Sequence, residues 1–382
     1  MQRFRDIIDK RHDYAREWKT RTGGKVMGYF CTYVPEELIY AAGVLPVRVL
    51  GSHEPQDVTE RYMGSMYCPF ARDVLAQGLK GRYDYLDGVA IATPCVHMRV
   101  AYSSWENHVP TPYKYYLNMP GKVQSPEAKP YLAAELALFK KSLEEWVGKP
   151  IGNEALDKAI EVYNTNRRLM RQIYDLRRQK KPSLTGAEAM EIVLSGMLMD
   201  KEEHNRLLAD VLKKLPIEGT RDGIRLMLIG SENDDVEMVR LTESLGGMVV
   251  IDELCTGSRY FWNEVILPSP LRGEGKGKGT YTDKILQAIA ARYIDRPPCP
   301  IKDYESRRRW THITQLAKDY QVQGAILMQQ KFCDPHEFDI PPLMAMLKEK
   351  LNIPSLFLES DVTIAAGQFR TRIEAFLETF QN

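Results

Sequence analysis

The sequence predicts an α/β protein with two Rossmann- or flavodoxin-like parallel-sheet regions and a helical region between them. Strand-sized apolar runs alternate with helical patterns at both ends of the chain, which implies parallel strands joined by right-handed crossovers. Long charged segments with apolar residues at three- and four-residue steps fill the middle. A turn-rich stretch, 216–223, precedes the second α/β region. We therefore predict domains over 1–124, 125–215 and 216–382.

The first α/β region begins with a charged segment that we predict to be helical. Pro35 suits the first turn of a short helix, and Gly43 can end that helix. The apolar runs 45–50 and 89–92 have the length and composition of strands, and a further helix is predicted over 68–79. The region therefore alternates between strands and helices.

The middle region is rich in Leu, Ala, Glu, Lys and Arg, which all favour helices. We predict helices over 130–146, 153–180 and 185–215, with a break at 182–185 that contains a proline. This composition sets the helical region apart from the two α/β regions.

Alternation returns in the last part of the chain. We predict strands over 224–229, 248–251, 325–328 and 355–358. Predicted helices cover 234–245, 304–320, 341–351 and 363–380. The glycine–lysine loop 271–280 lacks the residue order of a phosphate-binding P-loop, so we do not expect this chain to hydrolyse ATP.

Composition narrows the class of protein. Charged residues make up 27% of the chain and hydrophobic residues 44%, as in soluble globular proteins, and 382 residues suffice for two or three domains. The formal net charge of +1 gives no reason to expect nucleic acid or a membrane as a partner. The longest apolar runs are of strand length and the N-terminus lacks a signal peptide, so we expect a cytoplasmic protein whose six cysteines are not paired in disulfides.

Three cysteines lie where a metal or iron–sulfur site can form. Cys95 and Cys333 each follow a predicted strand, and Cys68 opens a predicted helix. Ligands of parallel α/β sheets bind at the carboxyl ends of the strands, and a helix N-terminus stabilises a thiolate. The spacing matches neither a ferredoxin nor a zinc ribbon, so scattered free cysteines filling small apolar gaps remain the alternative.

Several runs resemble one family. They are Gly28 to Arg48, Cys68-Pro-Phe-Ala-Arg72, Cys95, Asp252 to Tyr260, Cys333-Asp334, Leu358 to Asp361 and Gly367 to Phe376. In this order, over nearly the whole chain, they are similar to the benzoyl-CoA reductase and 2-hydroxyacyl-CoA dehydratase family. The run from Thr93 to Trp105 most resembles the smaller cluster-bearing subunit of ATP-dependent benzoyl-CoA reductase. Val96 stands where many relatives have Asp, which favours the reductase branch over the dehydratases.

The resemblance implies that Cys68, Cys95 and Cys333 hold a [4Fe–4S] cluster with one iron lacking a cysteine. It also implies an oxidoreductase that dearomatises benzoyl-CoA to a cyclic diene thioester by radical chemistry. The implied partners are a homologous larger cluster-bearing subunit, ATPase subunits with a bridging [4Fe–4S] cluster, and ferredoxin as electron donor. A lyase, the 2-hydroxyacyl-CoA dehydratase subunit, and a non-catalytic scaffold subunit are the alternatives.

Two further residues are candidates for catalysis. His97, two residues after Cys95, is a proton donor or thioester partner in one interpretation and a structural histidine in the other. Glu37, which matches a family position, binds substrate or transfers protons, or else it stabilises the start of a helix. The remaining cysteines are not expected to be ligands, with Cys31 and Cys255 packing near the cluster and Cys299 structural.

Overall fold

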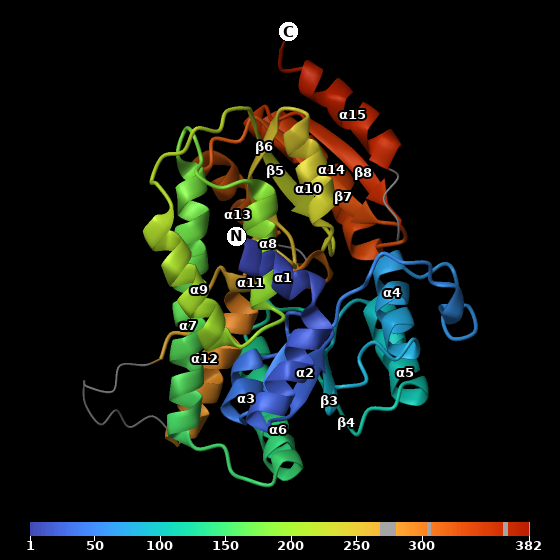
Figure 1. The fold of residues 1–382 in the computed structure, drawn as a ribbon, viewed down its shortest axis with the longest axis vertical. Helices are drawn as coiled ribbons and strands as arrows, with labels where there is room; N and C mark the ends of the chain where they lie inside the picture. Colours follow the sequence, from blue (N-terminus) through green and yellow to red (C-terminus); the bar gives the residue numbers. More distant parts are fainter. Residues whose placement is uncertain (268–279, 304–306, 362–365, 382) are drawn as a thin grey trace.

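A computed structural model describes residues 1–267, 280–303, 307–361 and 366–381 (Figure 1). Within them the predicted α/β class is confirmed by two four-stranded sheets whose strands are all parallel. The first sheet has the order β2-β1-β3-β4 and the second the order β6-β5-β7-β8. In both, the strand that comes first in the chain lies second in the sheet, as in flavodoxin-like folds. The two sheets thus share one topology.

The first α/β region extends to β4. Its strands are β1 (Val26–Tyr29), β2 (Leu45–Arg48), β3 (Gly88–Ala92) and β4 (Tyr113–Leu117). Its helices are α1 (Gln2–Asp9), α2 (Arg11–Thr22), α3 (Glu36–Ala41), η1 (Asp57–Thr59), α4 (Pro69–Leu79) and α5 (Val96–His108). Gly43 follows α3 with a φ of 76°, which explains why a glycine ends this helix. Sequence analysis assigned no element to β1, α5 or β4.

The middle region is helical, as predicted. It contains α6 (Ala128–Val147), α7 (Asn153–Asp175), η2 (Leu176–Arg178), α8 (Gly186–Gly196) and α9 (Lys201–Lys214). The single helix predicted over 185–215 was wrong, because it is two helices. Asp200 begins the second one, since its carboxylate accepts the backbone N–H groups of Glu202 and Glu203 at 3.0 Å each.

The last region carries the second sheet. Its strands are β5 (Ile224–Gly230), β6 (Gly247–Glu253), β7 (Gly324–Gln330) and β8 (Ser355–Ser360). Its helices are α10 (Val236–Ser244), α11 (Ser258–Phe261), α12 (Tyr281–Asp295), η3 (Pro300–Lys302), α13 (Arg308–Asp319), α14 (Asp334–Leu351) and α15 (Ala366–Glu378). Helix α14 begins before the predicted start at Pro341, which lies inside the helix. The described residues exclude 268–279, most of the glycine–lysine loop, and also 304–306 and 362–365, where two predicted helices begin.

Helix α12 links the last region to the first sheet. Its Ile285 and Ile289 are fully buried in one hydrophobic core with Leu136 and Phe139 of α6. Figure 1 shows α12 among the helices of the middle region, away from the second sheet. The proposed domain limits remain a prediction. A boundary at residue 216 would assign α12 to a different domain from α6, the helix against which it packs.

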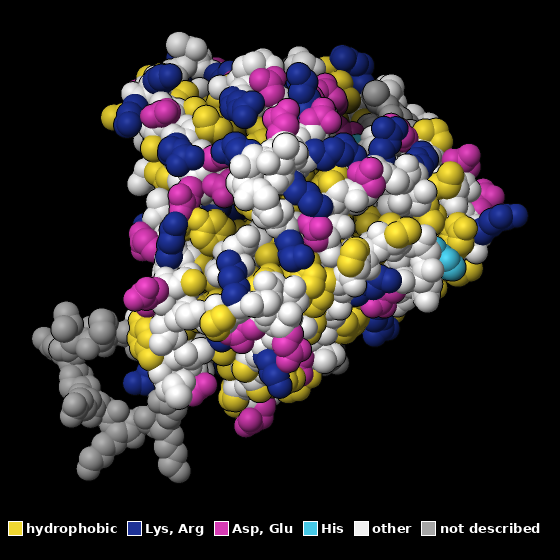
Figure 2. Space-filling model, turned by 60° about the horizontal axis from the view of Figure 1, so that its bottom comes forward, with side chains coloured by type: hydrophobic (Ala, Val, Ile, Leu, Met, Phe, Trp, Pro, Cys, Tyr) yellow, Lys and Arg dark blue, Asp and Glu magenta, His cyan; other side chains and the backbone are white. Residues whose placement is uncertain are grey.

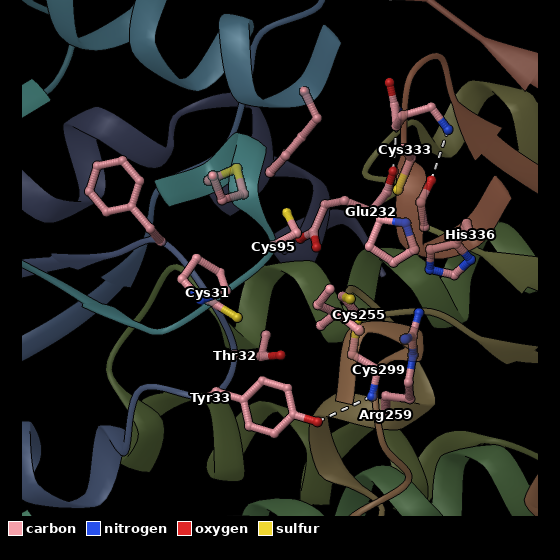
Figure 3. A pocket seen from close by; sticks show the side chains of 18 of the residues that line it. Cys31, Thr32, Tyr33, Cys95, Glu232, Cys255, Arg259, Cys299, Cys333 and His336 are labelled. Atoms are coloured by element: carbon pink, nitrogen blue, oxygen red, sulfur yellow. Dashed lines mark hydrogen bonds between the residues drawn. The ribbon is translucent and has the colours of Figure 1, made fainter. Parts of the chain in front are cut away.

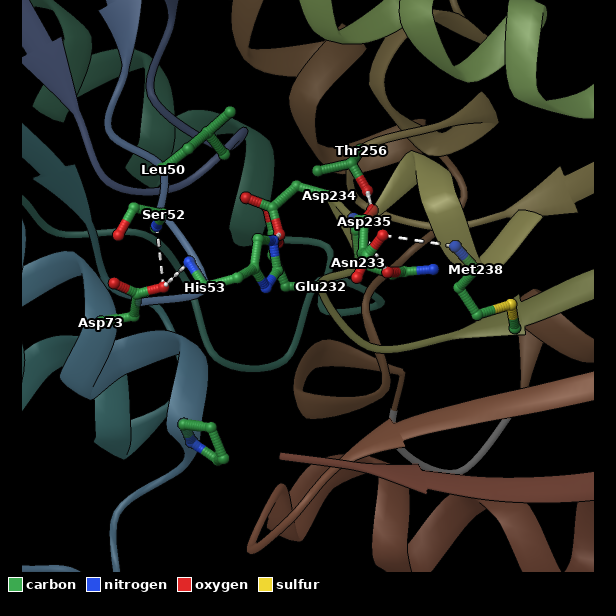
Figure 4. A network of polar contacts seen from close by, with 12 residues as sticks. Leu50, Ser52, His53, Asp73, Glu232, Asn233, Asp234, Asp235, Met238 and Thr256 are labelled. Atoms are coloured by element: carbon green, nitrogen blue, oxygen red, sulfur yellow. Dashed lines mark hydrogen bonds and ion pairs between the residues drawn. The ribbon is translucent and has the colours of Figure 1, made fainter. Parts of the chain in front are cut away.

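Polar contacts join the loops that leave the two sheets (Figure 4). Asp73 of α4 accepts the backbone N–H groups of Ser52 and His53, both at 2.8 Å. His53 Nε2 in turn lies 3.1 Å from Asp234 Oδ1, in the loop after β5. The segment that follows β2, an edge strand of the first sheet, is therefore held to the segment that follows β5, a central strand of the second.

The surface carries charges of both signs. Figure 2 shows Lys and Arg side chains interspersed with Asp and Glu over the face it presents, with no large area of one sign. That distribution agrees with the small net charge. Among the described helices, none has the length and hydrophobicity needed to cross a membrane.

Candidate functional site

A cavity of about 80 Å³ lies where the carboxyl ends of the two sheets meet, and all six cysteines line it (Figure 3). Cys31 follows β1, Cys95 follows β3, Cys255 follows β6 and Cys333 follows β7. Cys68 and Cys299 come from the segments that precede α4 and η3. None of the six forms a disulfide. The fold thus brings together thiols that are far apart in the sequence.

The three predicted ligands share one local arrangement. Cys68, Cys95 and Cys333 are the N-cap residues of α4, α5 and α14. Cys68 Sγ accepts the backbone N–H of Ala71 at 3.4 Å. Because the free N–H groups of a helix start carry partial positive charge, each of these positions favours a negatively charged sulfur.

The thiols interact with one another as well as with the helix ends. Burial raises the pKa of Cys68 to about 11. Burial, and then the neighbouring Cys68, raise the pKa of Cys95 well above its ordinary value, and burial with both neighbours does the same for Cys333. Three mutually close thiols in this state bind protons until a cation replaces them.

The other three cysteines form the rest of the thiol lining. A side-chain hydrogen bond links Cys255 and Cys299, which raises the pKa of Cys255 and lowers that of Cys299. Burial is the main cause that raises the pKa of Cys31, and the neighbouring Cys255 adds to it. These three cysteines were not expected to be ligands, and Cys299 was predicted to be structural. Cys255 follows the predicted strand 248–251, so the strand-end rule could have selected it, whereas Cys31 was out of reach because β1 was not predicted.

Buried cations surround the thiols. Arg48, Arg259, Arg296 and Lys302 line the cavity together with one acid, Glu232. Arg48 pairs with Glu232 at 2.7 Å, and Arg259 pairs with Glu253 at 3.0 Å. Within the described residues, neither Arg296 nor Lys302 has a carboxylate within ion-pair distance, and both lie over the ring of Tyr33. The cavity therefore has an excess of positive charge, which suits an anionic occupant.

His97 lies behind the thiols and is not among the residues that line the cavity. Its Nδ1 accepts the backbone N–H of Cys68 at 3.0 Å, and its Nε2 lies 3.6 Å from Asp334, the residue after Cys333. Burial is the main cause that lowers its pKa, opposed by the charge of Asp334. This position connects the segments of all three predicted ligands, and it favours the structural interpretation of His97 over the proton donor.

Glu37 is fully buried away from the cavity, in the first turn of α3. Its carboxylate accepts a hydrogen bond from Tyr293 at 2.8 Å and forms an ion pair with Arg167 of α7. Burial acts to raise its pKa, but the charges of Arg167 and Arg292 outweigh burial and hold the pKa at about 2. Glu37 therefore stays ionised and ties three helices together, an arrangement that favours a structural role.

The chemistry of the donor set fits an iron–sulfur cluster. In the described part of the chain, no group of three or more His, Cys, Asp or Glu residues is arranged to hold one metal ion. A single zinc ion draws its ligands within about 2.0–2.3 Å of one point. An iron–sulfur cluster instead distributes its cysteine ligands over several irons, so it accepts thiols on separate walls of a cavity. Six thiols with compensating cations fit such a group.

Known proteins resemble this chain along almost its whole length. The family described as "2-hydroxyglutaryl-CoA dehydratase, D-component" matches residues 31–380. The (R)-phenyllactyl-CoA dehydratase beta subunit of Clostridium sporogenes is 27% identical over 98% of this chain and 97% of its own. One of the subunits of benzoyl-CoA reductase from Thauera aromatica is 27% identical over 86% and 84%. The (R)-2-hydroxyglutaryl-CoA dehydratase subunit beta of Acidaminococcus fermentans is 27% identical over 94% and 93%. A reductase and two dehydratases thus stand at the same identity.

Proposed function

Because this chain belongs to the 2-hydroxyglutaryl-CoA dehydratase D-component family, we propose that it is the iron–sulfur subunit of an ATP-driven radical enzyme. The observation that carries the proposal is the convergence of all six cysteines on one cavity between two sheets. In this proposal Cys68, Cys95 and Cys333 hold a [4Fe–4S] cluster, each at the N-cap of a helix. When bound, such a cluster supplies one-electron transfer at low potential.

The chain's own residues would support that chemistry in two ways. Arg48, Arg259, Arg296 and Lys302 offset the negative charge of ligated thiolates and of an added electron. The apolar lining, which includes Phe30, Phe70 and Met98, limits the access of water to the cavity. Both effects favour a stable reduced state.

The second group of thiols extends the proposal. Cys31, Cys255 and Cys299 line the same cavity as the first three, beside Arg259. Ordinary structural cysteines fill separate gaps in a core, and three of them have no need to meet at one cavity. We therefore assign these three thiols to additional iron, so that the complete metal group is larger than one four-iron cluster.

The reaction we propose first is the reduction of an aromatic acyl-CoA, as in benzoyl-CoA reductase. A homologous larger cluster-bearing subunit, a separate ATPase with a bridging cluster and ferredoxin would complete the system in an anaerobic cytoplasm. The small cavity has a consequence for this reaction. Pockets that enclose drug-sized ligands measure roughly 300–1,000 Å³, whereas this one measures about 80 Å³. The CoA thioester would therefore lie outside the cavity, on a surface completed by the partner subunit.

The same volume favours a second candidate function. Once an iron–sulfur group occupies a cavity of about 80 Å³, the space that remains suits a substrate of only a few atoms. An ATP-driven reductase of small unsaturated molecules would use such a space directly, with the electron delivered to a substrate held among the arginines. Dehydration of a 2-hydroxyacyl-CoA is the lyase alternative. Like benzoyl-CoA, that substrate would have to lie outside the cavity.

Turnover distinguishes these functions. The anaerobic protein, with its ATPase partner and a low-potential reductant, is supplied in turn with benzoyl-CoA, a 2-hydroxyacyl-CoA and acetylene. Reduction of benzoyl-CoA or acetylene coupled to ATP hydrolysis would identify a reductase and its substrate class. Loss of water from the hydroxyacyl-CoA without net consumption of reductant would identify a dehydratase. Protein that contains no iron and acts on none of the three would contradict the proposal and leave a scaffold subunit.

A further inference from the structure

His336 is a buried histidine whose ring faces the cavity without a partner. It lies three residues after Cys333, in the first turn of α14, and it is 1% exposed. It lines the cavity together with Cys333 and Cys255, and Figure 3 labels all three. In the described structure neither Nδ1 nor Nε2 has a hydrogen-bond partner. His336 is not among the site residues predicted from the sequence.

Among the described residues, two other histidines are also buried, His97 and His204, and both have polar neighbours. His204 is 0% exposed, and its Nδ1 lies 2.7 Å from Asn166 Nδ2 while its Nε2 lies 3.0 Å from the carbonyl oxygen of Ile192. His97 Nδ1 accepts the backbone N–H of Cys68, and its Nε2 lies 3.6 Å from Asp334. Leaving a buried polar group unpaired is energetically costly, so native proteins rarely do so. The unpaired ring of His336 therefore points to an occupant of the cavity.

Arg259, another residue that lines the cavity, also has a buried N–H group without a hydrogen-bond partner in the part of the chain that the structure describes. Arg259 is 1% exposed and lines the cavity, and its Nη1 has no hydrogen-bond partner among the described residues. Its Nη2 donates to the carbonyl oxygen of Gly230 at 2.6 Å, which fixes the guanidinium plane. An imidazole carries at least one N–H in either protonation state, and a guanidinium carries only donors. The expected occupant is therefore an acceptor, as sulfide and thiolate sulfurs are.

We propose that His336 donates a ring N–H to a sulfur of the iron–sulfur group and thereby raises the reduction potential of that group. This inference rests on the proposed function. A donor directed at a sulfur stabilises the reduced state more than the oxidised state, because the reduced state carries one more negative charge. His336 is in this view a positioning and tuning residue, distinct from the cysteine ligands.

The test measures potential in the full-length anaerobic protein. His336→Phe keeps a planar ring without a donor, and His336→Gln keeps an N–H. His312→Phe is the matched control, because His312 also has an unpaired ring nitrogen but does not line the cavity. Iron content and the potential, from a redox titration followed by electron paramagnetic resonance, are determined for each variant.

The expected result is a more negative potential for His336→Phe at unchanged iron content, with His336→Gln and the control close to the wild type. Equal potentials in all four proteins would overturn the inference. So would loss of iron in His336→Phe alone, because that identifies His336 as a ligand rather than a donor. Absence of iron from the wild type would instead refute the proposed function, so the two failures are distinguishable.

Discussion

Replacing Glu37 with glutamine is expected to destabilise the fold. Its carboxylate is fully buried, and its partner Arg167 has a side chain only 5% exposed. The pKa of Glu37 is about 2 in the folded protein against an ordinary 4.5. At about 1.4 kcal/mol for each pKa unit, this difference corresponds to about 3 kcal/mol at neutral pH. Removing one partner of a buried ion pair generally costs about 3–5 kcal/mol, which agrees with the value obtained from the pKa of Glu37.

The pH dependence has a defined sign. The pKa of Glu37 is lower in the folded than in the unfolded chain, so its contribution is fully present above pH 4.5 and is lost as the pH falls toward 2. Urea denaturation followed by circular dichroism would measure the free energy of unfolding at pH 7. A matched control is Glu161→Gln, which removes an exposed ion pair with Arg168 and is expected to cost at most about 1 kcal/mol.

The catalytic prediction for Glu37 is decided by the same experiment. A Glu37→Gln protein that unfolds within about 1 kcal/mol of the wild type but has lost turnover would refute the structural reasoning. It would also return Glu37 to a role in proton transfer or substrate binding.

Two further predictions concern the site and the sheet beside it. His97→Phe removes the acceptor of the Cys68 backbone N–H. Iron affinity, measured by chelator competition, should therefore fall about 10–100-fold. Unchanged iron retention with lost turnover would instead make His97 the proton donor. Gly230→Ala places a Cβ against the Met328 carbonyl oxygen on the neighbouring strand and should lower stability by about 1–3 kcal/mol in thermal unfolding. Gly121→Ala meets no atom within 4 Å and is the control, so equal melting temperatures for the two variants would show that the sheet accommodates the methyl group.

The fold and part of the site followed from local patterns. Apolar runs bounded by helical segments located the strands of the second sheet together with β2 and β3, because buried parallel strands are continuous in hydrophobicity. The missed strands are β1, a run of four residues that contains a glycine, and β4, whose Tyr-Lys-Tyr-Tyr-Leu side chains are mostly half-buried. The rule that strand ends carry ligands placed Cys95 and Cys333 at one cavity, and sequence order alone gave no sign that Cys299 would join them.

Long-range partners set the roles that the sequence did not predict. Glu37 meets Arg167 and Tyr293, which are 130 and 256 residues away in the chain. His97 meets the backbone of Cys68, a group that no side-chain pattern identifies. His336 was overlooked because its distinguishing property is a missing partner, which only the packed structure reveals.

The most direct test of the central claim is the content of iron and acid-labile sulfide per chain in anaerobically purified protein. The measurement compares the wild type with Cys95→Ser and Cys299→Ser, one from each group of thiols, and with Ser195→Ala, a buried residue outside the cavity. The account predicts more than the roughly four irons of a single cluster in the wild type, and a loss of iron in both cysteine variants but not in Ser195→Ala. A wild type without iron, or iron content indifferent to Cys95 and Cys299, would contradict it.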